Sequence, residues 1–397
     1  MRKVTLIYID SGGGHRAAAT ALRDVIGSQN RPWEVEAVSI QNLFAPIDFV
    51  RQFTGIPFQD IYNIILRKGW TLGSAQMIRA MHLLMRMSHG SQVKVLRQYW
   101  EQSQPDLVVS LIPHFNRAIK EALNAARPSV PLVTILTDIA DHPPHFWMER
   151  PSLEHGHQYV VCGSERAASQ ARAIGISPDR IFQTSGMILN PGFYAGPKID
   201  RDAERARLGL RPGVPTGLVL FGGEGSEEMV DIARAVNRTG GQPVQLILLC
   251  GKNAKVATKL QALHQRIPMF IEGFTREVPF YMELADFFIG KPGPGSISEA
   301  LAKRLPVIVQ RNAWTLAHER YNADWVEEQG FGLVVRNFAA DIGAAVETLV
   351  APENYIRFRE RAAGTRNRAV FEIPEILESI LHTGAENYTA ECKEAAA

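Results

Sequence analysis

Cysteine is scarce in this sequence: only three cysteines, Cys162, Cys250 and Cys392, occur in 397 residues, and they lie far apart. An odd number of widely spaced cysteines predicts neither a disulfide framework nor a cysteine-based metal site, and it favours a reducing compartment. Long apolar runs are also missing. The run over residues 4–9 is cut by Asp10, so it is too short for a secretory signal, and no uninterrupted run approaches the roughly 18 residues of a membrane-spanning helix.

Neither sign of charge dominates, because 43 Lys and Arg residues face 41 Asp and Glu residues. A formal charge of +2 gives no strong steering toward nucleic acid, so no nucleic-acid partner is expected. Hydrophobic residues at 46% and charged residues at 21% are close to average usage, which argues against disorder and against a multi-spanning membrane protein. The length exceeds what one hydrophobic core usually serves and predicts two domains.

The stretch from Ala285 to Gln310 predicts a strand, a glycine- and proline-rich loop, a helix over Ile297 to Arg304 and a second strand. Gly293 and Gly295 in the loop allow close approach of the backbone to a ligand. The first amides of the helix are unsatisfied and partly positive, so a phosphate fits there.

Ser296 is expected to cap this helix, and Glu299 either closes a capping box or reaches a ribose hydroxyl beside the phosphates. The alternative is a capped helix of an ordinary α/β protein with no ligand.

A similar unit opens the chain, where a strand over residues 4–9 leads through the loop Ser11-Gly-Gly-Gly-His15 into a helix from Arg16 to Ile26. The spacing is not the dinucleotide fingerprint, so a nicotinamide enzyme is disfavoured. His15 is either a polar residue at a helix start or a base. The positive end of the helix disfavours a second positive charge, which favours a neutral imidazole able to accept a proton.

Alternation of strands and helices predicts a parallel, doubly wound sheet in each half of the chain. In the second half, a strand over Gly217 to Phe221 precedes a second phosphate-type loop with Gly222, Gly223, Gly225 and Ser226. We predict a first domain at residues 1–190, a linker at 191–200, and a second domain at 201–397 that includes the C-terminal helix.

The segment from Phe49 to Trp100 is basic and apolar, with a single acidic residue, Asp60. Its basic residues are Arg51, Arg67, Lys68, Arg79, Arg86, Lys94 and Arg97. This composition is typical of a segment that lies on an anionic bilayer, and its helical apolar spacing fits buried core helices equally well.

Several motifs together resemble one family. The strongest are Lys291-Pro-Gly-Pro-Gly-Ser-Ile-Ser-Glu-Ala-Leu301 and the loop at 11–15, and they are accompanied by Gly273-Phe274, Cys250-Gly-Lys-Asn253, Thr137-Asp138 with His142, and Glu319 with Asn322. The chain resembles the monogalactosyldiacylglycerol synthases and bacterial processive diacylglycerol glucosyltransferases, relatives of the peptidoglycan lipid II glucosaminyltransferase.

This resemblance implies the GT-B architecture, with two doubly wound Rossmann-like domains facing a central cleft. It implies that the loop with Gly293, Pro294, Gly295 and Ser296 meets the diphosphate of a UDP-sugar and that Glu299 holds the ribose. It further implies a uracil contact at Phe274 and contacts of Glu319 and Asn322 with the donor sugar. Gly251 and Lys252 complete the donor side.

On the acceptor side the resemblance implies Gly13, Gly14, Asp138 and His142, with His15 as the catalytic base. The function expected is inverting transfer of a hexose from a UDP-sugar to a lipid, with diacylglycerol as the expected acceptor, by a peripheral protein on the cytoplasmic face of the cell membrane. No cofactor and no metal are expected, since His142 and His145 have no third ligand nearby. The alternatives are a UDP-sugar 2-epimerase and a non-catalytic, membrane-attached subunit that binds nucleotide sugars.

Overall fold

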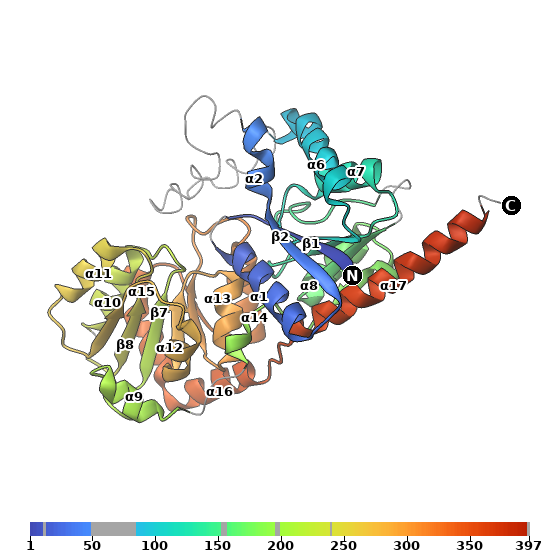
Figure 1. Ribbon diagram of the computed structural model, residues 1–397. Helices are drawn as coiled ribbons and strands as arrows, with labels where there is room; N and C mark the ends of the chain where they lie inside the picture. Colours follow the sequence, from blue (N-terminus) through green and yellow to red (C-terminus); the bar gives the residue numbers. More distant parts are fainter. Residues whose placement is uncertain (11–12, 49–84, 152–156, 195–198, 239, 395–397) are drawn as a thin grey trace. The chain divides into compact units, whose positions relative to one another are not determined.

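The computed structural model describes residues 1–10, 13–48, 85–151, 157–194, 199–238 and 240–394, with side chains to residue 382 (Figure 1). The predicted membrane-facing segment Phe49 to Trp100 therefore lies mostly outside the described residues. The chain divides into two compact units. One holds the described residues up to Asn190 together with those from Asn367 onward, and the other runs from Pro191 to Arg366.

The first unit is built on a six-stranded parallel sheet in the order β2-β1-β3-β4-β5-β6. Its strands are β1 (Arg2–Tyr8), β2 (Trp33–Ser39), β3 (Leu107–Ser110), β4 (Leu132–Ile135), β5 (Gln158–Cys162) and β6 (Ile181–Gln183). Its helices are α1 (Gly14–Ser28), α2 (Ile40–Phe44), α6 (His89–Ser103), α7 (Asn116–Ala126), α8 (Glu165–Ala173) and α17 (Ala369–Glu394), with short 3-10 turns at Ala45–Ile47 and Pro178–Arg180.

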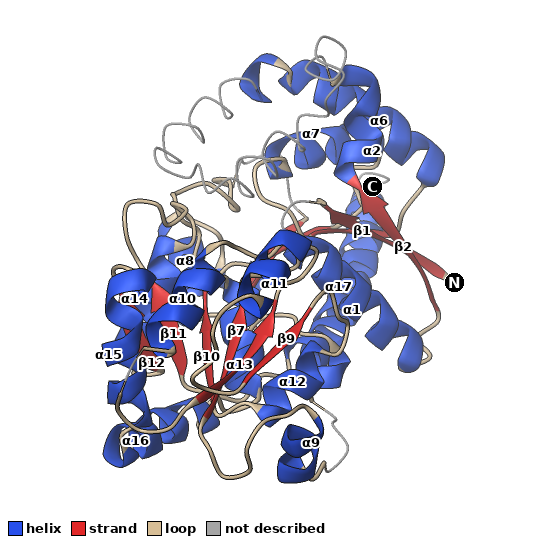
Figure 2. Cartoon of the chain, turned by 90° about the vertical axis from the view of Figure 1, so that its left-hand side faces the viewer, coloured by secondary structure: helices blue, strands red, loops and turns tan. Residues whose placement is uncertain are grey.

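The second unit has a parallel sheet of its own in the order β12-β11-β10-β7-β8-β9 (Figure 2). Its strands are β7 (Thr216–Leu220), β8 (Gln245–Leu249), β9 (Met269–Glu272), β10 (Phe287–Gly290), β11 (Val307–Gln310) and β12 (Gly332–Val335). After the 3-10 turn Pro191–Phe193, its helices are α9 (Arg201–Arg207), α10 (Glu228–Val236), α11 (Ala254–Gln261), α12 (Val278–Leu284), α13 (Pro294–Ala302), α14 (Arg320–Gln329), α15 (Phe338–Val350) and α16 (Pro352–Ala363). The prediction of two doubly wound α/β halves is confirmed.

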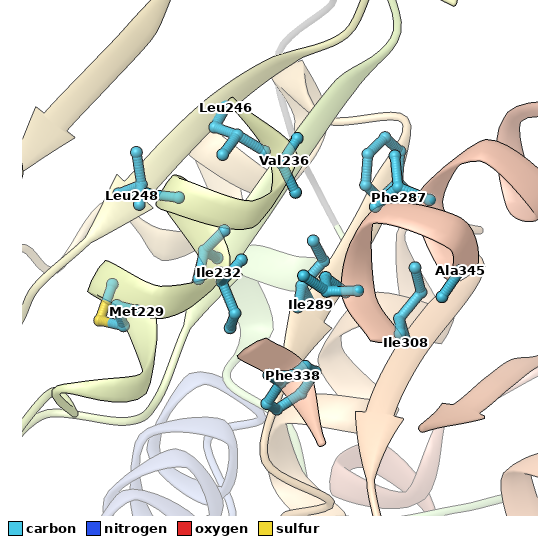
Figure 3. Packing of buried hydrophobic residues seen from close by; sticks show 14 of the residues in the cluster. Met229, Ile232, Val236, Leu246, Leu248, Phe287, Ile289, Ile308, Phe338 and Ala345 are labelled. Atoms are coloured by element: carbon cyan, nitrogen blue, oxygen red, sulfur yellow. The ribbon is translucent and has the colours of Figure 1, made fainter. Parts of the chain in front are cut away.

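The core of the second unit shows why these strands are almost continuously apolar. Side chains of α10 and α15 share one buried cluster with residues of the central strands, among them Phe287 and Ile289 (Figure 3). A Cβ at Gly217 would lie 2.6 Å from the ring of Phe287, so this glycine makes room for the aromatic side chain. A sheet covered by helices on its faces buries both sides of each strand, which removes the polar-apolar alternation.

The C-terminal helix belongs to the first unit, whereas the sequence grouped it with the second. The buried residues Ile373 and Leu377 of α17 share a core cluster with Val4, Leu6 and Leu22, and α17 lies against α1 (Figure 1). The predicted range 201–397 followed chain order. Chain order alone does not show that a helix returns to an earlier sheet.

Polar contacts fix the place where the chain returns to the first unit. The carboxylate of Glu372 accepts hydrogen bonds from the backbone N–H of Ser185 at 2.8 Å and from its hydroxyl at 2.7 Å. The side-chain amide of Asn367 donates to the carbonyl of Met187 at 2.9 Å. A Cβ at Gly186 would come within 2.6 Å of Asn367, so the glycine allows this segment to approach.

We expect Leu377→Ala to lower the free energy of unfolding of the first unit by about 2–5 kcal/mol, because the leucine is fully buried in its core. Denaturant unfolding with limited proteolysis measures which unit opens first. Ile356→Ala, at a residue that is 56% exposed on α16, is the control and should change stability by less than about 0.5 kcal/mol. Earlier opening of the second unit in the Leu377 variant would contradict the assignment of α17.

Candidate functional site

Two glycine-rich loops leave the second sheet side by side. The strand order reverses between β7 and β10, because β8 and β9 continue on one side of β7 while β11 and β12 continue beyond β10. The loop with Gly222 follows β7, and the loop with Gly293 follows β10. In open parallel sheets ligands bind beyond the carboxyl ends of the strands at such a reversal point.

The loop after β7 is packed against the loop after β8. Gly225 and Gly251 both have positive φ, at 63° and 58°, and a Cβ at Gly225 would overlap the carbonyl oxygen of Cys250. The backbone N–H of Lys252 donates to the carbonyl of Gly223 at 2.9 Å. Gly225 and Gly251 are therefore required by the loops themselves, whether or not a ligand is present.

Lys252, in the loop after β8, lies close to Phe274, in the loop after β9. The ammonium of Lys252 lies 5.8 Å from the centre of the Phe274 ring and 3.4 Å from a carboxylate oxygen of Glu224. The Phe274 residue is 57% exposed, and the nearest heavy atom to a Cβ at Gly223 would be in its ring, at 4.0 Å. An exposed aromatic ring beside a glycine loop gives a flat ligand a surface on which to stack.

The start of α13 differs from the prediction. The N-cap residue is Gly293, Pro294 occupies the first turn, and no side chain caps the helix. Ser296 is two residues past Pro294, inside the first turn, so the prediction that Ser296 caps the helix is wrong. Nothing lies within 4 Å of the position that a Cβ at Gly295 would take. The start of α13 thus combines amides without a side-chain cap and open space, which suits an anion.

Glu299 lies one turn further into α13 and is half-buried. The helix begins too early for Glu299 to close a capping box with the N-cap, which excludes that alternative. Burial raises the pKa of its carboxyl to about 7. A carboxyl group in this setting is able to accept hydrogen bonds from a ligand such as a ribose.

Glu319 and Asn322, at the start of α14, contact the loop after β10. The ammonium of Lys291 lies 2.7 Å from Glu319 Oε1. Asn322 is fully buried, and its side-chain amide donates to the carbonyl of Pro292 at 2.9 Å. The resemblance implied that Asn322 contacts the sugar, whereas the structure gives it the task of fixing the loop, which leaves the sugar contact of Asn322 as a prediction.

In the first unit, His15 lies where the strand order reverses between β1 and β3. Its Nδ1 is 2.9 Å from the carbonyl oxygen of Leu111 and 3.1 Å from the hydroxyl oxygen of Thr137. A carbonyl only accepts, so Nδ1 carries a proton, and in the neutral ring Nε2 is then the acceptor. The N-cap of α1 is Gly13, with no side-chain cap, so His15 is not a capping residue. Gly14 and His15 are the first two residues of α1.

Asp138 and His142, which were also expected on the acceptor side, differ in burial. Asp138 is buried, and its carboxylate accepts a hydrogen bond from the indole N–H of Trp147 at 2.8 Å, which is a structural contact. His142 is exposed in the loop that follows. The Trp147 ring centre is 5.8 Å from that of His15, so Asp138 acts on the surroundings of His15 through this tryptophan.

Sequence reasoning gave no role to three residues of these sites: Lys291 and Thr137, which it quoted only as parts of motifs, and Asp141. Asp141 accepts backbone hydrogen bonds from Trp147 at 2.7 Å and His145 at 3.2 Å, and burial raises its pKa to about 6 against these bonds. Lys291 directly follows the buried strand β10, and Thr137 lies two residues after the buried strand β4. A polar residue just beyond a strand end was the signal available.

Among the described residues no cluster of three or more His, Cys, Asp or Glu side chains is arranged to hold a metal ion. Asp200 and Asp202 form an Asp-x-Asp pattern, a motif that can hold a metal ion, but Asp200 is the N-cap of α9. Its carboxylate accepts hydrogen bonds from the backbone N–H groups of Asp202 and Ala203, each at 3.1 Å.

Residues 217–371 match the glycosyltransferase family 28 C-terminal domain. This range contains the loops after β7, β8, β9, β10 and β11 described above. The protein is a glycosyltransferase. The chain is 29% identical over 355 residues to a probable monogalactosyldiacylglycerol synthase 2 of Oryza sativa subsp. japonica, covering 84% of this chain and 70% of the rice protein. It is 26% identical to the monogalactosyldiacylglycerol synthase of Spinacia oleracea, covering 96% and 73% of the two chains.

Solved structures confirm the fold of this glycosyltransferase. S. aureus MnaA with UDP aligns over 96% of this chain and 97% of its own, with a TM-score of 0.59 and 16% identity. The calicheamicin glycosyltransferase CalG4 aligns over all of both chains, with a TM-score of 0.56 and 18% identity. A UDP-GlcNAc 2-epimerase from Neisseria meningitidis reaches 0.57 over 96% and 100%, with 15% identity. The fold is therefore shared by transferases and epimerases. The match to the glycosyltransferase family 28 C-terminal domain is what favours a transferase for this chain.

The predicted GT-B architecture and the predicted enzyme class, a glycosyltransferase, are confirmed by these matches. The likeness to plant monogalactosyldiacylglycerol synthases is also confirmed, whereas the relation to bacterial diacylglycerol and lipid II transferases stays a prediction. Within the part of the chain that the structure describes, no helix is long and apolar enough to cross a membrane.

The raised pKa of Glu299 predicts a pH-dependent stability. The folded protein keeps this proton up to about pH 7, whereas the unfolded chain loses it near the usual value of 4.5. Stability therefore falls as pH rises between these values. We expect Glu299→Gln to remove this loss and to stabilise the unliganded protein at pH 8, relative to wild type, by on the order of 1–2 kcal/mol.

Denaturant unfolding at pH 5 and pH 8 measures the effect. The control is Glu353→Gln, at an exposed position of α16, which should behave alike at both pH values. A Glu299→Gln variant whose difference from wild type does not grow with pH would show that the carboxyl is ionised throughout.

Proposed function

We propose that this glycosyltransferase moves a hexose from a UDP-sugar to a lipid alcohol, diacylglycerol, with inversion at the anomeric carbon. The observation that carries the proposal is the start of α13, where uncapped amides and open space at Gly295 follow β10 at the reversal point of the sheet, where β10 pairs with β7. Such a site binds a diphosphate. The plant relatives, named for galactose and diacylglycerol, support the choice of acceptor and make galactose the first sugar to test.

The donor contacts follow from the arrangement of the second unit. The diphosphate binds the amides of Gly295 and Ser296 at the start of α13, with Lys252 as a nearby cation. Uracil stacks at the exposed ring of Phe274, and the ribose hydroxyls bond to Glu299. Glu319 accepts hydrogen bonds from the sugar. No metal is needed to neutralise the leaving group in this proposal, because the helix start and lysines supply positive charge.

His15 supplies the base. Its Nε2 takes the proton of the acceptor hydroxyl while the acceptor oxygen forms a bond to the anomeric carbon. The bond from that carbon to the diphosphate oxygen breaks, and its electron pair leaves with UDP. Attack opposite to the leaving group inverts the anomeric configuration. The carbonyl of Leu111 holds Nδ1–H at 2.9 Å and so keeps Nε2 available.

The chain is proposed to act as a peripheral protein on the cytoplasmic face of the cell membrane, because its lipid acceptor resides there. Anionic lipid is the proposed surface, which rests on the basic composition of residues 49–100.

The direct test is incubation of the purified protein with radiolabelled UDP-sugars and diacylglycerol in anionic vesicles, followed by extraction into organic solvent. Label in the organic phase supports transfer. Conversion of the free UDP-sugar into its 2-epimer, without labelled lipid, would support the epimerase alternative instead. Binding of UDP-sugar with neither product would support a non-catalytic subunit.

We expect His15→Asn to lower kcat by roughly 10²–10⁴-fold, the range for loss of a general base. Asparagine is able to keep a donor near the Leu111 carbonyl while it lacks a basic Nε2, so stability and UDP affinity should change little. Single-turnover kinetics and calorimetric UDP titration measure the two effects. Near-normal turnover in this variant would reject His15 as the base.

We expect Gly295→Ala to weaken UDP binding by about 10–100-fold, because the new methyl group enters the space assigned to the diphosphate and displaces a charge-assisted hydrogen bond. Stability should stay equal or rise by up to about 1 kcal/mol, since alanine favours a helix and meets no neighbour there. Calorimetric titration and thermal unfolding separate these effects. Unchanged UDP affinity would place the diphosphate elsewhere.

A further inference from the structure

The ion pair between Lys291 and Glu319 is unequally buried. Its two charged atoms are 2.7 Å apart, the Glu319 side chain is 7% exposed, and the Lys291 side chain is 40% exposed. Burial alone would raise the pKa of Glu319, but the charges of Lys291 and His318 and the hydrogen bond from Lys291 outweigh it and lower the pKa. Glu319 therefore remains ionised in a buried position, and it does so beside a cation that a ligand is able to reach.

The pair lies directly against the loop that opens α13. A Cβ at Gly293 would be 3.5 Å from Lys291 Cε and 3.8 Å from Glu319 Oε1. The backbone N–H of Gly293 donates to the carbonyl of Lys291 at 2.8 Å, and Asn322 holds the carbonyl of Pro292. Residues 291–293 thus join the start of α14 to the start of α13, so Lys291 lies beside both Glu319 and Gly293, the N-cap residue of α13.

We propose that Lys291 is a shared cation of the donor site: it neutralises Glu319 in the empty protein and turns to the diphosphate when a UDP-sugar binds. The proposal rests on the function proposed above and adds a residue to it. An ammonium has three N–H donors, so it is able to keep one for Glu319 while others bond to phosphate oxygens. Glu319, held less tightly, then has free lone pairs for hydroxyl groups of the sugar.

This arrangement couples the two ends of the donor. A diphosphate attracts Lys291 more strongly than one carboxylate does, because it carries more charge. The Glu319 carboxylate becomes fully available to sugar hydroxyls only when the diphosphate is in place. A free sugar without UDP would meet a Glu319 that is still neutralised. Lys291 is therefore a binding residue for the diphosphate and a positioning residue for the sugar.

The test uses opposite changes in UDP affinity, measured by calorimetric titration of the full chain. Lys291→Met removes the cation and should weaken UDP binding at least about tenfold, the loss of one charge-assisted hydrogen bond. Glu319→Gln leaves Lys291 without its competitor, so UDP should bind as tightly as to wild type or several-fold more tightly. The same Glu319 variant should lose the extra affinity that a UDP-sugar has over UDP.

A matched control lies at the other end of the same helix. Lys303, the C-cap residue of α13, pairs with Glu283 of α12 at 3.0 Å, and its side chain is 9% exposed, so Lys303→Met also breaks a Lys–Glu pair next to α13. That variant should bind UDP like wild type. If Lys291→Met unfolds because it leaves a buried charge alone, the double variant Lys291→Met with Glu319→Gln removes both charges and should still bind UDP at least tenfold more weakly than Glu319→Gln.

Two results would overturn the inference. Wild-type UDP affinity in Lys291→Met, or equal weakening by Lys291→Met and Glu319→Gln, would make the pair a structural contact only. In either case UDP binding by wild type would leave the proposed function standing. A wild-type protein that binds no UDP would instead overturn the proposed function, and the inference with it.

Discussion

The reversal of strand order between β7 and β10 is the constraint on which the proposed donor site depends. Connections from β7 lead toward β8, and connections from β10 lead toward β11, so the loops that leave these two neighbouring strands turn apart. The carboxyl ends of both strands are then left without a crossing connection above them. Glycine is needed where the strands meet, because a Cβ at Gly290 would overlap the carbonyl oxygen of Leu220. The site is thus a consequence of the topology, and side chains refine it.

Much of this could be predicted from sequence, because short-range signals determine it. A buried parallel strand is a short apolar run, and the loop after it must contain residues that tolerate tight turns. The strand-loop-helix segments around Gly13, Gly222 and Gly293 could therefore be recognised in the sequence. The strand Trp33–Ser39 was not predicted. It lies at the sheet edge, where Glu34 and Glu36 interrupt the apolar pattern.

What could not be predicted depends on contacts between distant residues. Ser296 has the side chain of a good cap, but Pro294 is compatible with the first turn and fixes the start of the helix before it. Lys291 and Glu319 are 28 residues apart, and nothing in their spacing indicates an ion pair. The bond from His15 to Leu111 joins a side chain to a backbone carbonyl 96 residues away. Such pairings follow from sheet order, which sequence patterns do not supply.

Glu319 and Glu299, the two carboxyl groups of the proposed donor site, differ in their surroundings. Glu319 has Lys291 within 2.7 Å and stays ionised, whereas Glu299 has burial as the cause of its raised pKa and holds its proton up to about pH 7. Two ionised carboxylates beside a diphosphate would repel it. A protonated Glu299 avoids part of that repulsion and is still able to donate and accept hydrogen bonds with a ribose. In the proposed donor site one charged and one neutral carboxyl group would face the same ligand, and the difference arises from the positive charges of Lys291 and His318 beside Glu319.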